Sequence, residues 1–195
     1  MTAVAPEKLV FPDECGFALN LHRFYGWVSG GGRCCQEVPF QRGKNRSVVG
    51  AFSLPAGTAG TAGTADTADT ADNGMRALWH KLGAMTREDF EHFLRDHLLP
   101  ELSAGHVLVL DNARIHHGGH SQEWVEAAGC SLLHLPPYSP DLSPIELAWS
   151  WIKNCVRAQA PRDDESRQQA IQDAAAQMPA HAAPRWFKMC GYGLP

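Results

Sequence analysis

The chain has 195 residues, 44% of them hydrophobic and 19% charged, and this balance excludes both a disordered protein and a membrane protein. Its 17 lysines and arginines against 21 aspartates and glutamates give a net charge of −4. A protein that holds nucleic acid mainly through bulk positive charge is therefore not expected. The length predicts a single domain that spans residues 1–195.

The N-terminal region carries acidic residues, Glu7, Asp13 and Glu14, which interrupt any secretory signal, and no apolar stretch is long enough to span a membrane. We therefore predict a cytoplasmic protein without membrane contact. The six cysteines show no CxxC spacing, so free thiols are expected rather than disulfides.

A short repeat separates two strand-like runs at 47–54 and 75–82. Two Thr-Ala-Gly units and three Thr-Ala-Asp units fill residues 58–72. These side chains are too small to offset the entropy of being ordered. We predict a flexible insertion at 56–73 in the loop of a β-hairpin.

The remaining elements follow from apolar spacing and from capping residues. Thr86 and Asp89 form a capping-box pattern, and Ser143, Pro144 and Glu146 form another, so a helix is expected to begin at each. The order predicts an α/β fold with a mixed sheet, antiparallel first and parallel later. Strands are expected at 8–11, 17–28, 47–54, 75–82, 107–110 and 131–135, and helices at 86–100, 121–128, 144–160 and 165–178.

Three carboxylates stand at the ends or starts of predicted elements: Asp13, Asp111 and Glu146. Functional groups of α/β proteins gather at such positions, so the three could meet in one cleft. An all-oxygen cluster suits Mg²⁺ or Mn²⁺, and two such ions could support phosphodiester chemistry.

Each of these acids also has a purely structural interpretation. Asp111, which precedes Asn112, could form an Asx-turn, and Glu146 could complete the capping box of Ser143. Asp13 and Glu14 are adjacent in a strand, so at most one of them faces any given site.

The surrounding motifs resemble those of a known family. Between Asp111 and Glu146 lie 34 residues, and the segment DNARIHH…LPPYSPDLSPIELAWSWIK is similar to the catalytic core of DDE transposases, above all the mariner superfamily and its bacterial insertion-sequence relatives. FPDECGF at 11–17, with YGW at 25–27, resembles the segment that holds the first catalytic aspartate of this family. RWFKMCGY at 185–192 resembles the C-terminal end of the bacterial branch.

The resemblance implies a ribonuclease-H-like fold, a mixed five-stranded sheet flanked by helices, in which Asp13, Asp111 and Glu146 hold two Mg²⁺ ions, with Mn²⁺ able to substitute. In such enzymes a metal-activated water cuts one strand at the element end, and the freed 3′-hydroxyl then attacks target DNA. The carboxylates act there as ligands and not as nucleophiles. Asn112 and His116 match positions beside the second aspartate that orient the site, although a structural hydrogen bond is an equal alternative for His116.

The implied partners are the terminal repeats of the element, target DNA and a second copy of the chain in a synaptic complex, located on the bacterial nucleoid. Clustered cations in one loop and on the helix after Glu146 are candidates for contacts with phosphates. These are Arg42, Lys44, Arg46, Lys153 and Arg157. Trp79, Trp149 and Trp151 are interpreted as packing residues rather than as platforms for bases.

Three departures from the family pattern stand out. Pro12 removes a ladder hydrogen bond in what the fold makes a central strand, and Ser143 stands where many relatives carry Asn. Only 12 residues precede Asp13, which leaves no room for the helix-turn-helix region of full-length relatives. The chain could be a downstream reading frame, a frameshift partner or a truncated remnant, and a separate polypeptide could supply that region. These departures keep two alternatives open: an inactive remnant that only binds DNA or dimerises, and a ribonuclease-H-like nuclease that cuts without joining.

Overall fold

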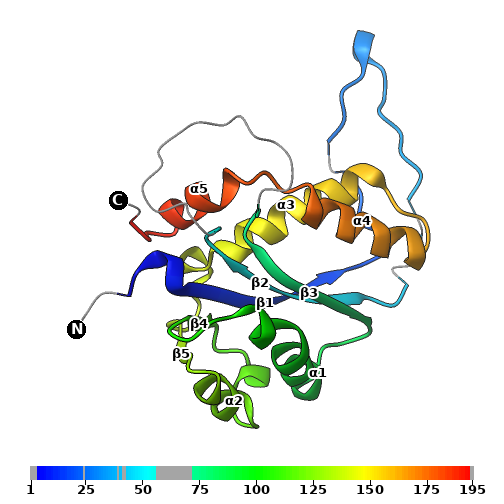
Figure 1. Cartoon of the computed structure of the whole chain (residues 1–195). Helices are drawn as coiled ribbons and strands as arrows, with labels where there is room; N and C mark the ends of the chain where they lie inside the picture. Colours follow the sequence, from blue (N-terminus) through cyan, green and yellow to red (C-terminus); the bar gives the residue numbers. More distant parts are fainter. Residues whose placement is uncertain (1–3, 24, 39, 41–42, 56–71, 194–195) are drawn as a thin grey trace.

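The computed structural model describes residues 4–23, 25–38, 40, 43–55 and 72–193 (Figure 1). Most of the predicted insertion at 56–73 lies outside these residues, so its flexibility stays a prediction. All six cysteines lie within the described residues and are unpaired. Among the helices of this part of the chain, none is both long and apolar enough to cross a bilayer.

A five-stranded sheet with the order β3-β2-β1-β4-β5 forms the centre of the molecule. The antiparallel pairs β1–β2 and β2–β3 come first in the chain, and β4 and β5 then run parallel to β1, which confirms the predicted mixed sheet. The strands are β1 (Leu9–Phe17), β2 (Arg46–Ser53), β3 (Met75–Leu82), β4 (Val107–Leu110) and β5 (Ser131–His134).

The strand predicted at 17–28 is wrong. The first strand instead runs through Pro12 and ends at Phe17, and the described residues from 18 to 28 lie outside the sheet. Apolar alternation continues past Phe17, but no strand pairs with the described residues that follow it up to residue 28, and Leu21 packs on the core from a loop instead.

Helices cover both faces of the sheet (Figure 1). On one face lie α1 (Arg87–Phe93) and α2 (Ser121–Ala127), and on the other lie α3 (Pro144–Gln159), α4 (Asp164–Ala176) and α5 (Ala182–Met189). The turn Leu94–Leu98 extends α1, and single turns occur at Pro6–Lys8, Ser29–Gly31, Leu99–Glu101, Arg114–His116 and Pro140–Leu142.

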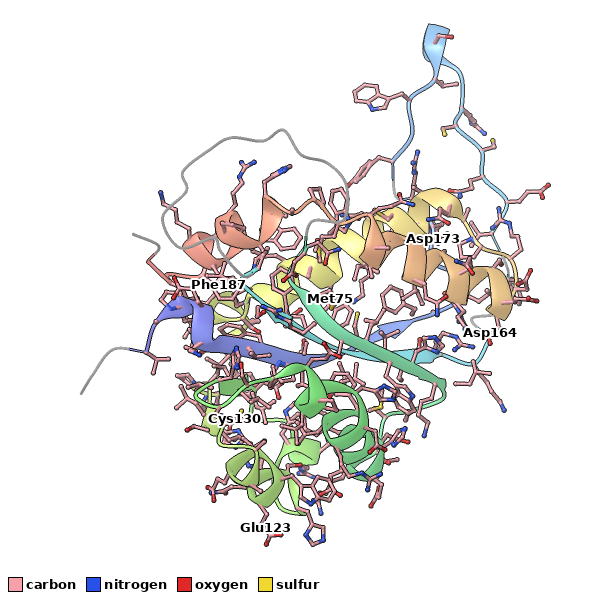
Figure 2. The ribbon with its side chains drawn as sticks, viewed as in Figure 1. Met75, Glu123, Cys130, Asp164, Asp173 and Phe187 are labelled. Carbon is pink, nitrogen blue, oxygen red and sulfur yellow. The ribbon has the colours of Figure 1, made fainter. Side chains whose placement is uncertain are left out.

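Side chains of β1 alternate between the two cores. Phe11 and Phe17 belong to the cluster under α3, α4 and α5, whereas Val10 belongs to the cluster under α1 and α2. Helix α5 was not predicted from the sequence. Its Phe187 points toward the sheet (Figure 2) and meets Phe11 edge to face, with 5.4 Å between the ring centroids. By the same alternation, Asp13 faces α3 and Glu14 faces α1, as the adjacent positions predict.

The sheet opens between its two central strands. β1 pairs with β4 only at Leu9 and Val10, while β4 continues beside β5 as far as Leu110. Pro12 therefore sits where β1 has already left β4, and on its other side it still pairs with Ala51 of β2. The missing N–H of the proline does not break the strand, and the fork beyond Val10 gives access to the end of β4.

Candidate active site

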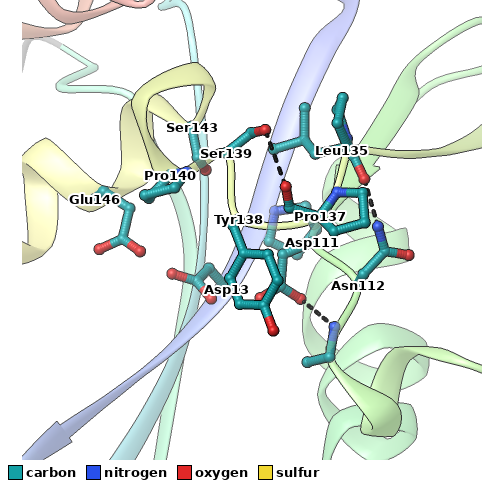
Figure 3. Close-up of a pocket in the computed structure, with 13 residues that line it drawn as sticks. Asp13, Asp111, Asn112, Leu135, Pro137, Tyr138, Ser139, Pro140, Ser143 and Glu146 are labelled. Atoms are coloured by element: carbon teal, nitrogen blue, oxygen red, sulfur yellow. Dashed lines mark hydrogen bonds between the residues drawn. The ribbon is translucent and has the colours of Figure 1, made fainter.

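The three predicted acids come together at this fork. Asp13 from β1, Asp111 from the end of β4 and Glu146 from the first turn of α3 line one pocket of about 390 Å³ (Figure 3). That volume lies within the range of small-ligand sites, about 300–1,000 Å³. Loop 135–140 forms the opposite wall. Three segments far apart in the sequence thus present carboxylates to one cavity.

Asp13 is held in place by Trp149, which was predicted only to pack in the core. The buried Trp149 donates its indole N–H to Asp13 Oδ2 at 3.1 Å. The indole fits because Gly50 lies opposite Asp13 on β2, where an added Cβ would come within 2.8 Å of the Trp149 ring. Burial, and then the negative charges of Glu14 and Glu146, raise the pKa of Asp13 to about 7.

We expect Trp149→Phe to raise the Mn²⁺ concentration that half-saturates the protein about tenfold, because loss of a hydrogen bond behind a metal-binding carboxylate typically costs 10–100-fold in affinity. Calorimetric titration with Mn²⁺ measures this shift. Trp151→Phe is the matched control, since among the described residues the Trp151 N–H has no hydrogen-bond partner. Equal Mn²⁺ affinity of the two variants would refute this role of Trp149.

Asp111 both forms a turn after β4 and lines the pocket. Its Oδ1 accepts a hydrogen bond from the Ala113 N–H at 2.8 Å, which is the Asx-turn that the sequence allows, and from His116 Nδ1 at 2.7 Å. The hydrogen bond from His116 holds the pKa of Asp111 below its usual value. The carboxylate is thus fixed in one orientation while it lines the pocket.

His116 bridges two carboxylates beneath the site. Its ring is fully buried and packs 4.5 Å from the Phe90 ring, and its Nε2 lies 3.0 Å from Glu14 Oε1. Burial alone would lower the pKa of His116, but the hydrogen bonds with Asp111 and Glu14 and the charges of both raise it to about 10. The imidazolium therefore neutralises two acids and positions Asp111, and the part played by Glu14 was not predicted.

Glu146 does not take part in the predicted capping box. The Glu146 N–H donates to the Ser143 carbonyl at 3.1 Å, and the Ser143 N–H donates to the Pro140 carbonyl at 3.1 Å. Both backbone donors that the box requires are used by the turn Pro140–Leu142 and the first turn of α3, and the Ser143 side chain makes no cap. The Glu146 carboxylate is thereby left exposed on the pocket.

The donor chemistry of this pocket suits a hard divalent cation, because carboxylate oxygens are the ligands that Mg²⁺ and Mn²⁺ prefer. Burial first, and then the negative charges of Glu14 and Glu146, oppose ionisation of Asp13, and a bound cation would favour its ionised form. Within the described residues, no three such side chains surround one point closely enough to hold an ion as they stand. The three carboxylates thus fit an ion by the chemistry of their oxygens.

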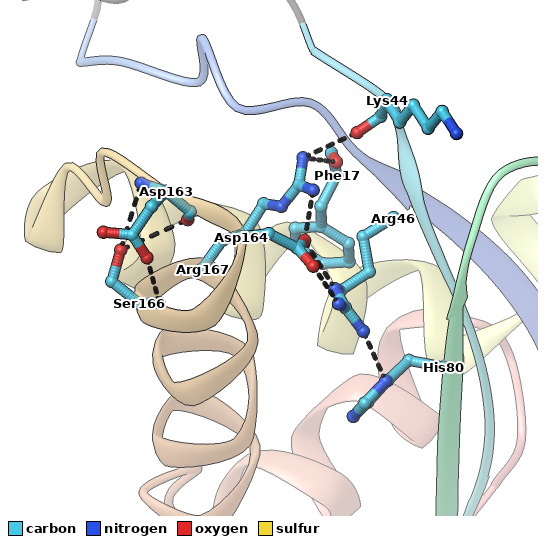
Figure 4. Close-up of polar contacts among 8 residues, drawn as sticks. All are labelled: Phe17, Lys44, Arg46, His80, Asp163, Asp164, Ser166 and Arg167. Carbon is cyan, nitrogen blue, oxygen red and sulfur yellow. Dashed lines mark hydrogen bonds and ion pairs between the residues drawn. The ribbon is translucent and has the colours of Figure 1, made fainter.

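One predicted DNA-binding residue is corrected by the structure. Arg46 is buried at the start of β2, where it pairs with Asp164 and contacts His80 Nδ1 at 2.7 Å (Figure 4). A guanidinium held in this way cannot reach phosphates. The Lys44 side chain is exposed and points away from this cluster, and Arg42 lies outside the described residues.

The two cations of α3 lie downstream of Glu146. Lys153 is half-buried and lies beside Cys15 of β1. Burial raises the pKa of the Cys15 thiol to about 11, although the positive charge of Lys153 acts to lower that pKa. Arg157 donates to Asn154 Oδ1 at 3.0 Å on the same helix.

Asn112 donates its side-chain N–H to the Leu135 carbonyl at 2.5 Å and so ties the end of β4 to loop 135–140.

Comparisons with solved structures agree with this fold. The chain is similar to the Mos1 transposase in its paired-end complex with the left transposon end, with 16% identity, a TM-score of 0.66 and coverage of 95% of this chain and 52% of that one. For the Mos1 strand transfer complex the identity is 15% and the TM-score 0.64, with coverage of 95% of this chain and 51% of that one. For the catalytic domain of Mos1 mariner transposase the identity is 12% and the TM-score 0.56, with coverage of 95% of this chain and 76% of that one. The fold is therefore ribonuclease-H-like, and the chain spans about half the length of the Mos1 chains in the two DNA complexes.

Sequence comparisons give the family. No curated protein matches the chain. The model of a family described as DDE superfamily endonuclease matches residues 67–168, just over half of the chain, including Asp111 and Glu146. The chain belongs to the DDE superfamily endonuclease family.

Proposed function

We propose that this protein is the catalytic domain of a transposase, which cuts DNA at the ends of a mobile element and joins the freed 3′ ends to target DNA. The observation that carries the proposal is the pocket in which Asp13, Asp111 and Glu146 meet at the fork of the sheet. Three converging carboxylates suit two-metal phosphodiester chemistry, and they occur in a chain of the DDE endonuclease family.

In this proposal Asp13, Asp111 and Glu146 hold two Mg²⁺ ions, for which Mn²⁺ can substitute. When bound, the ions supply activation of the attacking oxygen and charge stabilisation of the leaving oxygen. The chain contributes fixed orientation. Trp149 holds one oxygen of Asp13, and His116 holds one oxygen of Asp111. Pre-positioned ligands of this kind reduce the reorganisation that binding and catalysis require.

Local cations, rather than net charge, support the contact with DNA. Three of the four excess negative charges are Asp66, Asp69 and Asp72 of the repeat, which leaves the rest of the chain close to neutral. Lys153 lies on the same helix as Glu146, and Lys44 is exposed just before β2. We propose that these two residues and Arg157 contact phosphates, and that a helix-turn-helix polypeptide supplies recognition of the terminal repeats.

The proposal includes a homodimer, a bacterial insertion-sequence origin and a location on the nucleoid. Support for a protein partner comes from the segment between β1 and β2, where Trp27, Val28 and Phe40 are exposed. Exposed apolar side chains gathered on one excursion are typical of an interaction surface.

The test of the proposed function is a nicking assay with supercoiled plasmid and Mn²⁺, followed by a joining assay that supplies duplex oligonucleotides with free 3′-hydroxyl ends. We expect the purified protein to convert supercoiled plasmid to the open-circular form and to link the oligonucleotides covalently to plasmid. Nicked plasmid without linked oligonucleotide would identify a nuclease that cuts without joining.

A second candidate is a folded domain without catalytic activity, favoured by the open arrangement of the three acids, which do not enclose an ion as they stand. Calorimetry separates the two candidates. Binding of Mn²⁺ at millimolar concentration that disappears in Asp111→Asn supports the enzyme. Absence of binding by a fully folded protein, together with absence of nicking, supports the inactive domain.

A further inference from the structure

A tyrosine stands at the mouth of the pocket without contacts of its own to the core. Tyr138 belongs to the loop 135–143 between β5 and α3, and the residue is 102% exposed although it lines the pocket. Figure 3 shows its ring extending from the loop toward the side of the pocket that holds Asp13 and Asp111. Aromatic rings normally stabilise a fold by burying a large apolar area, and this one buries none.

The backbone holds Tyr138 in a conformation that side chains of its size rarely adopt. Its φ is +58°, in the left-handed region. Such strain persists only where the surroundings determine the conformation, and it gathers at functional sites. Here the surroundings are Pro136, Pro137 and Pro140, each of which fixes its own φ.

The loop is also tied down at both ends. At its start the Asn112 amide donates to the Leu135 carbonyl at 2.5 Å, and near its end the Tyr192 hydroxyl donates to the Leu142 carbonyl at 2.7 Å. These two hydrogen bonds hold the backbone of the loop near both of its ends, and a tyrosine side chain has only two main rotatable bonds to restrict. Tyrosine in such a setting gains contact area on binding at a small entropic cost.

The position of the ring defines the ligand. The carboxylates deeper in the pocket would receive a phosphodiester, which is too polar to pack on an aromatic face, so the group beside the ring is the base of an adjoining nucleotide. A flat base stacks on an aromatic ring whatever its identity. A base inside a duplex has both faces covered by its neighbours, so it reaches the ring only after leaving the stack.

We propose that Tyr138 is a stacking site for an unpaired nucleobase that flanks the phosphodiester in the acid pocket. The proposal rests on the proposed function, since that function places DNA in the pocket. It adds that the enzyme holds one nucleotide out of the duplex at the cleavage site, and that it does so without preference for a particular base.

The first experiment measures binding without catalysis. A short labelled single-stranded oligonucleotide of mixed sequence is titrated with protein in the presence of EDTA, and fluorescence anisotropy gives the Kd. We expect Tyr138→Ala and Tyr138→Leu each to weaken binding about tenfold, and Tyr138→Phe to retain most of it, because stacking needs the ring and not the hydroxyl. Met189→Ala, which removes an exposed apolar side chain of α5 outside the pocket, is the control.

The second experiment asks whether the ring acts by holding a base out of the stack. Nicking is compared on a fully paired duplex and on one with a mismatch beside the mapped cut. Tyr138→Ala is expected to be slower than wild type on the paired duplex and to recover on the mismatched one, because an unpaired base is already out of the stack. A merely structural role of Tyr138 predicts the same defect on both substrates and an altered melting temperature.

The outcomes separate this inference from the proposed function. If wild type nicks DNA and Tyr138→Ala matches it in both assays, the stacking site is overturned and the function stands. Equal loss of oligonucleotide binding in Tyr138→Phe and Tyr138→Ala also overturns stacking, because the hydroxyl would then be responsible. If wild type does not nick but Tyr138→Ala still weakens binding of the oligonucleotide, the proposed function falls and the stacking site stands.

Discussion

Asp111→Asn is expected to lower the rate of plasmid nicking in Mn²⁺ at least about 1,000-fold, because in the proposed mechanism it removes one charged ligand of cations that would supply several kcal/mol of stabilisation. The amide oxygen of asparagine can still accept the hydrogen bonds from Ala113 and His116, so the turn after β4 should keep its shape. Initial nicking rates and a urea denaturation curve measure the two effects separately.

The matched control for Asp111→Asn is Asp141→Asn. Asp141 lies in the turn Pro140–Leu142 next to the pocket, but it is exposed and does not line it. The same change of charge at that position should leave the nicking rate within about twofold of wild type. Nicking by Asp111→Asn at the wild-type rate would exclude Asp111 from the catalytic site and with it the proposed mechanism.

Asp164→Asn is expected to cost about 2 kcal/mol of unfolding free energy, less than the roughly 3–5 kcal/mol for breaking a fully buried ion pair, because the Asp164 side chain is 38% exposed. Asp164, in the first turn of α4, accepts hydrogen bonds from Arg46 and Arg167, whose side chains are only 7% and 2% exposed. Without the carboxylate, two buried guanidinium groups lose their negative partner. Arg167 would keep its bonds to the Phe17 and Lys44 carbonyls, so the fold is weakened rather than lost (Figure 4).

The neighbouring substitution Asp163→Asn serves as the control for Asp164→Asn. Asp163 caps the same helix, and its side chain accepts a hydrogen bond from the Ser166 N–H at 2.7 Å. Asparagine caps helices about as well as aspartate, so this variant should stay within about 0.5 kcal/mol of wild type in urea denaturation. Equal loss of stability in both variants would point to the helix terminus rather than to the arginines.

Acid unfolding provides an independent check of the same pair. The hydrogen bonds from Arg46 and then Arg167 lower the pKa of Asp164 to about 2 from its ordinary value of 3.8. Because the pKa is lower in the folded state, the stabilisation is complete above pH 4 and is lost as the pH falls toward 2. The unfolding free energy of wild type should therefore fall more steeply between pH 4 and pH 2 than that of Asp164→Asn.

Local patterns predicted the fold well where only neighbouring residues were involved. The capping box of Thr86 and Asp89 is present, with the Thr86 N–H donating to Asp89 Oδ2 at 2.8 Å. The similar pattern at Ser143 and Glu146 correctly predicted the start of α3. It forms no capping box because the preceding turn takes the Ser143 N–H, and a sequence pattern does not record how a backbone donor is already used. The Glu146 side chain is therefore left exposed on the pocket.

Contacts across long sequence separations were not predictable from the residues alone. Trp149 and Asp13 are 136 positions apart, and His116 and Glu14 are 102 apart. Tryptophan on a buried helix stripe normally packs, and only the register that places Gly50 opposite Asp13 makes room for its hydrogen bond. The burial of Arg46 likewise depends on Asp164 in a helix 118 positions away, so a loop of clustered cations misled the prediction of DNA contacts.

Strands β2 and β3 are joined by a hydrogen bond at the point where the connection that contains the repeat begins and ends, so the number of repeats can change without a change in the strands. The Ser53 N–H donates to the Gly74 carbonyl at 2.9 Å, and the two strands pair from Arg46 with Leu82 to Phe52 with Met75, with one shift of register between Ala51 and Phe52. Gain or loss of a Thr-Ala-Gly or Thr-Ala-Asp unit changes the coding sequence by whole codons, and doubling a loop costs only about 0.6 kcal/mol of closure entropy. Gene copies that differ in repeat number should therefore encode the same sheet and the same pocket, which makes the number of repeats a neutral marker of descent.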